Sequence, residues 1–317
     1  MVNHLTLVLL FASFLSCKSG ANLLVEEGPT GTAVFQAMSL TGDSLFTTID
    51  SATQEHQIRA VRQAESAYQN DASLANLIWL GRRQAYLGRY DLAIDTYSEA
   101  INKFPDSYEA LRHRGHRYIT IREFDKAIGD FEKAASLMAS EELVTEQDGM
   151  PNKENIPLTT VQFNVWYHLG LAHYLKEDYQ KALSAYEECM EVSNNDDLLV
   201  ATLDWKYMTM KKLGKDREAD HLLSKVTEDM NIIENDAYYY RLLMYKGVID
   251  PEELIQEDIT SESGRLQYVT QGYGLGNHYL RQDKVQEATE TFLNVMKTNY
   301  WAAFGYIASE MELARLK

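Results

Sequence analysis

Small and aromatic residues recur along this chain at one constant offset. Each copy contains a glycine, an aromatic residue, an alanine, a second aromatic residue and a second alanine, in that order. The matched pairs are Gly81 and Gly115, Tyr90 and Phe124, Ala93 and Ala127, Tyr97 and Phe131, and Ala100 and Ala134. This pattern predicts a repeated pair of helices, in which small residues let the helices approach and large residues fill the remaining gaps.

The offset also predicts how the units follow one another. Units one and two occupy 74–141, units three and four occupy 163–233, and a final unit with a capping helix occupies 269–317. Gly170, the next glycine of the pattern, lies much further from Gly115 than Gly115 lies from Gly81. The additional residues between Gly115 and Gly170 indicate an inserted loop over 142–162, which contains Pro151 and Pro157. Such a loop is either functional or merely tolerated. A leading helix is expected at 53–73, and an irregular helical segment at 234–268.

This arrangement resembles the tetratricopeptide repeat, whose period is about 34 residues. The resemblance implies an all-α fold, a right-handed superhelical solenoid of helix-turn-helix units. It also implies a non-enzymatic scaffold or adaptor that binds a protein or peptide partner in its concave groove. The interruption before the last unit is similar to the layout of the new lipoprotein I family, adaptors for periplasmic cell-wall hydrolases and their protease.

The first residues differ in character from the repeats. Leu5 to Leu15 is an apolar run that is too short to span a bilayer, and Cys17 follows it. The run resembles a bacterial lipoprotein signal, which implies that 1–17 is a signal peptide ending at a lipidated Cys17. Residues 18–52 are then expected to be a tether, with a short ordered piece around Ala37 to Ile49. The expected location is the bacterial cell envelope, at the outer membrane, with a soluble body outside the cytoplasm. The alternative is ordinary secretion with cleavage elsewhere.

Charge is distributed unevenly. The net charge of −17 argues against nucleic acid as a partner, because binding there requires a basic face. From Gly81 to Glu123, however, eight lysines and arginines face six acidic residues, a balance of +2. A locally basic surface suits an acidic or C-terminal peptide, because guanidinium groups bind carboxylates through two hydrogen bonds.

The family resemblance places the first helix of each unit along the groove. The partner-binding residues that it implies are Arg82, Arg112, His113, His116, Asn164, Tyr167, His168, Asp204 and Trp205. Among these, Arg82, Arg112 and Asn164 resemble part of a clamp for a terminal carboxylate. The alternative is that the arginines pair with acidic residues of neighbouring helices.

Two further residues are expected to be structural. Arg114 stands where the repeat has leucine, which predicts a half-buried, ion-paired side chain. Cys189 stands at the position of Ala100 and Ala134, which predicts a buried packing role.

Three classes of function remain open. The leading hypothesis is the lipid-anchored adaptor, with no metal and no cofactor. A metal-dependent or other hydrolase would use His113, His116 and His168 with Asp204, although no phosphate loop, Gly-x-Ser-x-Gly motif or His-Glu-x-x-His motif occurs. A structural subunit of an envelope assembly complex or a homo-oligomer would use the ends of the solenoid and the Tyr238–Tyr240 segment.

Overall fold

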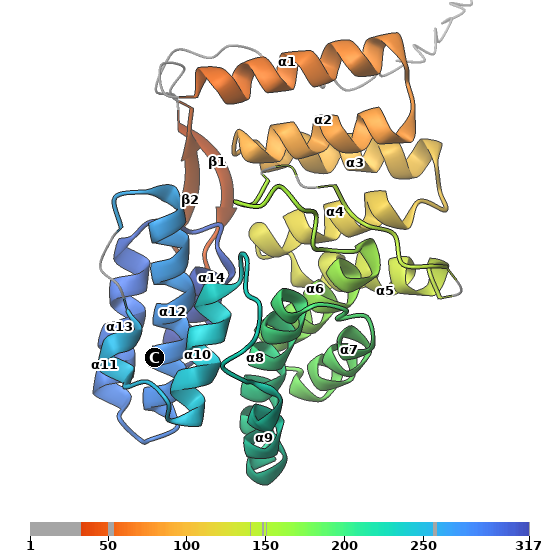
Figure 1. Ribbon diagram of the computed structural model, residues 1–317. Helices are drawn as coiled ribbons and strands as arrows, with labels where there is room; N and C mark the ends of the chain where they lie inside the picture. Colours follow the sequence, from red (N-terminus) through yellow and green to blue (C-terminus); the bar gives the residue numbers. More distant parts are fainter. Residues whose placement is uncertain are drawn as a thin grey trace, which may run out of the picture.

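The computed structural model describes residues 33–49, 54–139, 141–147, 149, 151–255 and 259–316, and these residues are mostly helical (Figure 1). The strands are β1 (Ala33–Met38) and β2 (Ser44–Thr48). The first helices are α1 (Glu55–Asn70), α2 (Leu74–Tyr86), α3 (Tyr90–Lys103), α4 (Tyr108–Thr120), α5 (Phe124–Leu137), α6 (Val161–Leu175) and α7 (Tyr179–Glu191). The remaining elements are α8 (Asp196–Lys212), α9 (Asp216–Leu222), the 3-10 turn η1 (Leu223–Lys225), α10 (Asp236–Lys246), α11 (Pro251–Leu254), α12 (Glu262–Leu280), α13 (Val285–Lys297) and α14 (Phe304–Arg315). The predicted all-α repeat fold is confirmed.

The glycine and aromatic positions of the pattern meet inside each helix pair. The glycine of the first helix faces an aromatic ring of the second helix. A Cβ atom added to Gly115 would lie 2.8 Å from the Phe131 ring, closer than carbon atoms pack. The same contact joins Gly81 to Tyr97, Gly170 to Tyr186 and Gly276 to Phe292. These pairs explain the repeat, because each glycine makes room for the aromatic ring that fills the space between the two helices.

Both residues that the sequence assigned to structure behave as predicted. Arg114 forms a 2.7 Å ion pair with Asp130 of α5, and the side chains are 20% and 9% exposed. Cys189 is a buried free cysteine, and burial raises the pKa of its thiol to about 12. The thiol is therefore protonated at neutral pH and acts as a small packing group.

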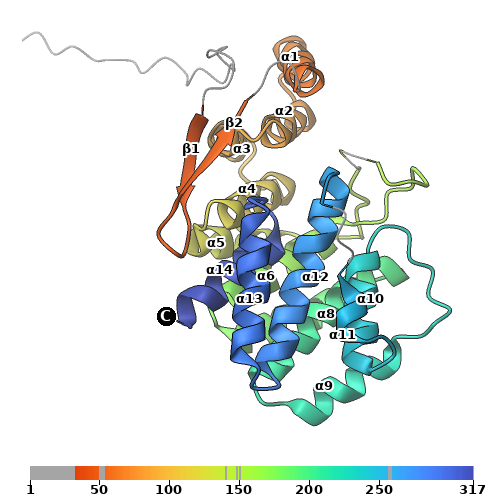
Figure 2. The ribbon, with the colours of Figure 1, turned by 90° about the vertical axis from the view of Figure 1, so that its left-hand side faces the viewer.

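An antiparallel hairpin occupies part of the segment expected to be a tether. β1 pairs with β2 from Ala33–Thr48 to Met38–Ser44. Gln36 accepts a hydrogen bond from the backbone N–H of Tyr90 at the start of α3, and the Trp301 indole donates to the carbonyl of Phe46. The hairpin thus connects the first repeat to the C-terminal helices (Figures 1 and 2). The expectation of little regular structure is therefore wrong for 33–36, which belong to β1, whereas the hairpin includes most of the short ordered piece expected around Ala37 to Ile49.

The C-terminal helices fold back against the middle of the row of repeats. α10 packs on α8, and α14 packs on α6, α12 and α13 (Figure 2). Buried ion pairs fix α14: Arg122 lies 2.7 Å from Glu310, and Lys212 lies 2.5 Å from Glu312. The groove that the family resemblance implies is therefore covered in its central part by this chain's own C-terminal helix.

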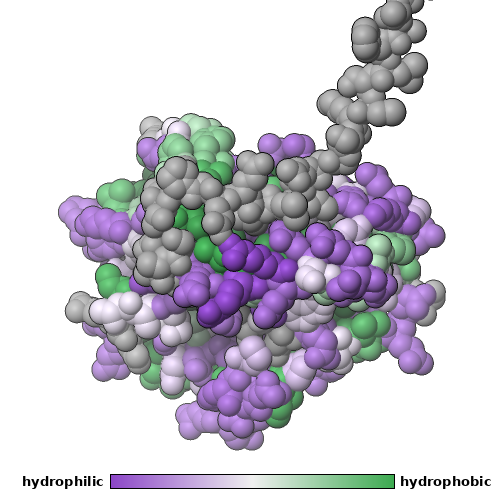
Figure 3. All heavy atoms as spheres, turned by 90° about the horizontal axis from the view of Figure 1, so that it is seen from above, coloured by the Kyte–Doolittle hydropathy of each residue, from purple (hydrophilic) through white to green (hydrophobic). Residues whose placement is uncertain are grey.

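Hydrophilic side chains cover most of the face that Figure 3 shows, with scattered hydrophobic ones between them. Among the described residues, no helix combines the length and apolar composition that crossing a membrane requires.

Candidate functional site

A partly open cavity of about 120 Å³ lies at the N-terminal end of the row of repeats. We call it the basic pocket. Three arginines and two histidines contribute to its lining, against one carboxylate. The lining residues are Arg82, Ala85 and Tyr86 of α2, Tyr97 of α3, Arg112, His113, His116 and Arg117 of α4, and Glu146 from the segment between α5 and α6.

Helix geometry collects these groups. α4 begins at Ser107, whose hydroxyl accepts a hydrogen bond from the backbone N–H of Ala110 and so caps the helix. Arg112 and His116 stand one helical turn apart, as do His113 and Arg117, so all four share one side of the helix. Arg117 is not among the residues that the family resemblance implies, and its spacing from His113 is the sequence signal that places it in this set.

Glu146 is the group that the predicted clamp holds. Its carboxylate lies 3.0 Å from Nε of Arg112 and accepts a 3.1 Å hydrogen bond from the Asn164 amide. Arg82 donates a 2.8 Å hydrogen bond to the backbone carbonyl of the next residue, Gln147. Arg82, Arg112 and Asn164 thus come together as the sequence suggested. The segment they hold belongs to the predicted inserted loop, and no sequence signal distinguished Glu146 from the other acidic residues there.

The protonation states of the pocket follow from burial and from the arginines. Burial, followed by the charges of Arg112, Arg82 and Arg117, holds the pKa of His113 well below its ordinary value. His113 is therefore neutral at pH 7. Nη1 of Arg112 lies 3.0 Å from Nδ1 of His113, and arginine can only donate. Nδ1 is therefore the acceptor, which places the proton on Nε2, 3.8 Å from the Glu146 carboxylate.

The positive charge of the pocket is only partly compensated. Burial lowers the pKa of Arg112, and Glu146 is the carboxylate that opposes this effect. The guanidinium of Arg117 lies over the Tyr90 ring at 5.4 Å, and within the described residues no acidic side chain forms an ion pair with it. Nε of Arg112 is close enough to Glu146 for a charge interaction, but its N–H is not aligned for a hydrogen bond to any acceptor in the part of the chain described here. Among the described residues, three guanidinium groups therefore share one carboxylate beside an open cavity.

The middle of the predicted groove is filled by aromatic stacking. The His116 and His168 rings lie 4.5 Å apart, and Phe304 of α14 lies 5.2 Å from His116. Burial lowers the pKa of His168 to about 3, so this ring is neutral. The Tyr167 hydroxyl donates a 2.8 Å hydrogen bond to the Tyr238 hydroxyl. Tyr167 and His168 therefore contact the C-terminal helices in this conformation.

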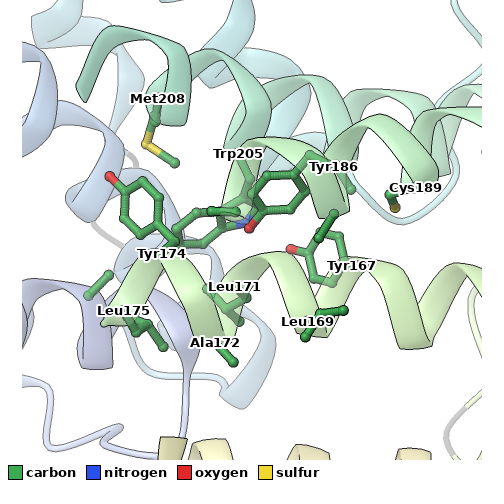
Figure 4. Close-up of a cluster of buried hydrophobic side chains, with 14 of the residues drawn as sticks. Tyr167, Leu169, Leu171, Ala172, Tyr174, Leu175, Tyr186, Cys189, Trp205 and Met208 are labelled. Carbon is green, nitrogen blue, oxygen red and sulfur yellow. The ribbon is translucent and has the colours of Figure 1, made fainter. Parts of the chain in front are cut away.

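The far end of the predicted groove is closed. Asp204 and Trp205 are 0% and 1% exposed, and Asp204 lies 2.9 Å from Nη2 of Arg241. Trp205 packs among the tyrosines of the core cluster in Figure 4. The prediction that Asp204 and Trp205 line an open groove is wrong, because α10 and α12 cover α8. For the neighbouring helix α6 the sequence does carry such a signal, because 161–175 is apolar around most of its circumference, which is typical of a helix buried on all sides.

The histidines do not form a ligand set. Across the described ranges, no three His, Cys, Asp or Glu side chains are grouped so that they could hold a metal ion. The His113 ring stacks on the Tyr97 ring with 5.5 Å between their centroids, and Asp204 forms an ion pair with Arg241. The proposed lipidation residue, Cys17, lies outside the described residues.

Comparison with known proteins supports the repeat interpretation. Two tetratricopeptide repeat family models match, over residues 80–140 and 163–196. The chain is similar to a tetratricopeptide repeat protein from Parabacteroides merdae, with a TM-score of 0.50 and 17% identity, over 84% of this chain and 94% of that one. YrrB, described as a TPR protein with an unusual peptide-binding site, aligns with a TM-score of 0.42 and 15% identity, over 75% of this chain and 93% of YrrB.

One curated protein is also similar in sequence. BBSome complex member BBS4 of Bos taurus is 27% identical over 155 residues, which are 49% of this chain and 25% of that protein. This chain therefore matches only about a quarter of that relative's length. Together with the helix pairs and their glycine–aromatic contacts, the family matches show that this chain contains tetratricopeptide repeats, at residues 80–140 and 163–196.

Proposed function

We propose that this protein is a non-enzymatic adaptor whose basic pocket binds an acidic peptide of a partner protein. Tetratricopeptide repeats indicate a protein-interaction scaffold, and the proposal adds the site and the chemistry of the ligand. The observation that carries it is the charge of the pocket: within the part of the chain that the structure describes, Arg82, Arg112 and Arg117 line an open cavity and Glu146 is the one carboxylate beside them.

An acidic side chain or a terminal carboxylate fits this site better than a neutral group. Arginine presents parallel N–H donors that match the two oxygens of a carboxylate. The neutral His113 offers one further N–H, and the Tyr97 and Tyr86 rings supply apolar walls that strengthen hydrogen bonds by excluding water. A cavity of about 120 Å³ accommodates one such group, with the rest of the peptide outside.

The direct test uses a fluorescein-labelled hexaglutamate peptide and a hexaglutamine peptide of the same length, with binding followed by anisotropy. We expect saturable binding of hexaglutamate alone, weakened by salt because the interaction is between charges. Arg117→Gln should reduce the affinity about tenfold, the value of one charged hydrogen bond. Arg217→Gln, an exposed arginine of α9, is the matched control and should leave the affinity unchanged. Equal binding of both peptides would contradict the proposal.

The natural partner is to be sought in cells. Crosslinking and pull-down of the tagged protein should recover a dominant partner that is lost in the Arg112→Ala/His116→Ala variant. Retention of that partner by a folded variant would place binding outside the basic pocket.

We further propose that the protein is a lipoprotein of the bacterial cell envelope, anchored at the outer membrane through Cys17. The support is the apolar run from Leu5 to Leu15 followed directly by Ser16 and Cys17. Metabolic labelling with an azide-bearing palmitate should mark the wild type and not Cys17→Ser. Equal labelling of both would contradict the anchor.

A further inference from the structure

We propose that residues 141–147, which we call the strap, are a tethered competitor that occupies the basic pocket until an acidic partner displaces Glu146. This inference rests on the proposed function and adds a regulation of the same site. The strap belongs to the insertion between α5 and α6, so it is absent from the regular repeat.

The strap imitates the ligand that the pocket is suited to bind. The Glu146 carboxylate lies 3.0 Å from the Arg112 guanidinium and accepts a 3.1 Å hydrogen bond from the Asn164 amide. The backbone carbonyl of Gln147 accepts a 2.8 Å hydrogen bond from Arg82. A carboxylate and the following backbone carbonyl are also what an acidic peptide would present. The strap therefore places in the pocket the same two groups that the peptide of a partner would place there.

The hold of the strap on the pocket depends on few groups. Glu146 is the strap residue that is partly buried, whereas Glu141 to Thr145 and Gln147 are exposed. Leu143 and Val144 are 45% and 40% exposed, so no apolar anchor secures the strap. Exchange of Glu146 for another carboxylate thus costs little apolar burial.

The backbone of the strap is held by hydrogen bonds that are separate from the contacts of the Glu146 side chain. The backbone N–H of Glu146 donates to the carbonyl of Thr159, and the N–H of Val161 donates to the carbonyl of Val144, both at 2.9 Å. These bonds pair the strap with residues at the start of α6 and do not involve the side chains that line the pocket. The Glu146 side chain can therefore leave the pocket while this pairing persists.

The pocket also has a place for an incoming group. The cavity beside Glu146 remains open, Arg117 forms no ion pair with a described acidic residue, and the Arg112 Nε–H makes no aligned hydrogen bond among the described groups. A second carboxylate can therefore enter beside Glu146 before Glu146 departs. This two-step exchange avoids an intermediate with three uncompensated guanidinium groups.

A tethered competitor lowers the apparent affinity by the fraction of molecules in which the site is open. If the strap is closed in nine molecules of ten, removing its carboxylate raises the affinity about tenfold. Glu146→Gln in the full chain removes the charge and keeps the size of the side chain. Glu142→Gln makes the same change on the exposed part of the strap and is the matched control.

The experiment measures hexaglutamate binding to the wild type and both variants, after their thermal unfolding has confirmed that each is folded. About tenfold tighter binding by Glu146→Gln, with Glu142→Gln equal to the wild type, is the expected result. Binding by the wild type that neither variant changes overturns the strap but leaves the proposed function standing. Equal tightening in both variants would mean general charge repulsion and also overturns the strap. Absence of binding to all three proteins overturns the proposed function and the strap with it.

Discussion

Two buried arginine–carboxylate pairs lie along the same row of helices, and they differ in what surrounds them. Arg112 and Glu146 are 3.0 Å apart with side chains 10% and 11% exposed, next to an open cavity. Arg241 and Asp204 are 2.9 Å apart with both side chains fully buried. The distance between charges is therefore nearly the same, whereas access for water and for other ions is not.

The elements that carry each pair explain the difference. Asp204 and Arg241 stand on α8 and α10, two packed helices, and the guanidinium also lies 5.6–5.8 Å from three aromatic rings. Glu146 stands on an exposed strap. An ion pair between packed helices therefore stabilises the fold, whereas an ion pair made by a loop at an open cavity is available for exchange.

The largest expected effect is the loss of the sealed pair. Arg241→Met, compared with the wild type at pH 8, above the Asp204 pKa of about 7, removes the counter-charge of an ionised Asp204 in the core, and breaking a buried pair in this way destabilises a protein by about 3–5 kcal/mol. Urea unfolding followed by circular dichroism measures the change. A loss below about 1 kcal/mol would show that this pair is as replaceable as the one at the pocket.

A milder change near the same pair comes from Gly274 of α12. A Cβ atom at this position would lie 2.3 Å from Nε of Arg241, so Gly274→Ala forces the guanidinium to shift and should destabilise by about 1–3 kcal/mol. Gly129→Ala on α5 is the control, because a Cβ atom there meets nothing within 4 Å. This control should stabilise by up to about 1 kcal/mol through helix propensity. Similar losses in both variants would contradict the tight packing around Arg241.

Arg112→Met is the counterpart of Arg241→Met at the pocket. Its effect on stability should be smaller than that of Arg241→Met, because the unpaired Glu146 side chain can turn into water from the exposed strap, which Asp204 between packed helices cannot do. Hexaglutamate binding should nevertheless be lost. A destabilisation as large as that of Arg241→Met would mean that the pocket pair serves the fold as well, and would break the comparison.

The two regions should also differ in the sign of their pH dependence. Burial raises the pKa of Asp204 to about 7, so between about pH 4 and 7 the folded state keeps a proton that the unfolded state has released, and stability falls as pH rises. Burial lowers the pKa of His168 to about 3, so between about pH 3 and 6.5 the unfolded state binds the extra proton and stability rises with pH.

Variants can separate these opposing effects in unfolding experiments from pH 4 to 6. Asp204→Asn should make the slope of stability against pH more positive, and His168→Phe should make it less positive. Each change is at most about 1.4 kcal/mol per pH unit, the value for one proton. Slope changes of the same sign would contradict the assignment of these protonation states.

The sequence predicted well wherever contacts are local. The constant offset from Gly115 to Phe131 and from Gly81 to Tyr97 indicated a contact within one helix pair, and the structure has it. The structural role of Arg114 was recognisable because a charged residue replaced the leucine of the repeat. Within the pocket, Arg82 and Arg112 were found because the repeat places them on successive first helices.

Other parts of the site depended on contacts that the repeat does not encode. Nothing local marks Glu146 as the carboxylate that reaches Arg112, because the whole of α5 separates the two in the sequence. Asp204 was assigned to an open groove because its own repeat places it there, and Arg241 on a later, irregular segment buries it. The repeat pattern does not predict the strand pair at 33–48 either, because the hairpin is held by residues distant in the sequence, Tyr90 and Trp301.

Three features can be predicted from the amino-acid sequence alone: the repeating helix pairs, the glycine–aromatic contacts within them and the clustering of positive charge on α2 and α4. These features follow from helical periodicity and nearest-neighbour packing, which act over one or two units. Only the tertiary structure decided that the strap enters the pocket and that α14 covers the middle of the row. Such contacts join residues as far apart as Arg122 and Glu310, and complementary charge and burial select them only after the chain has folded back on itself.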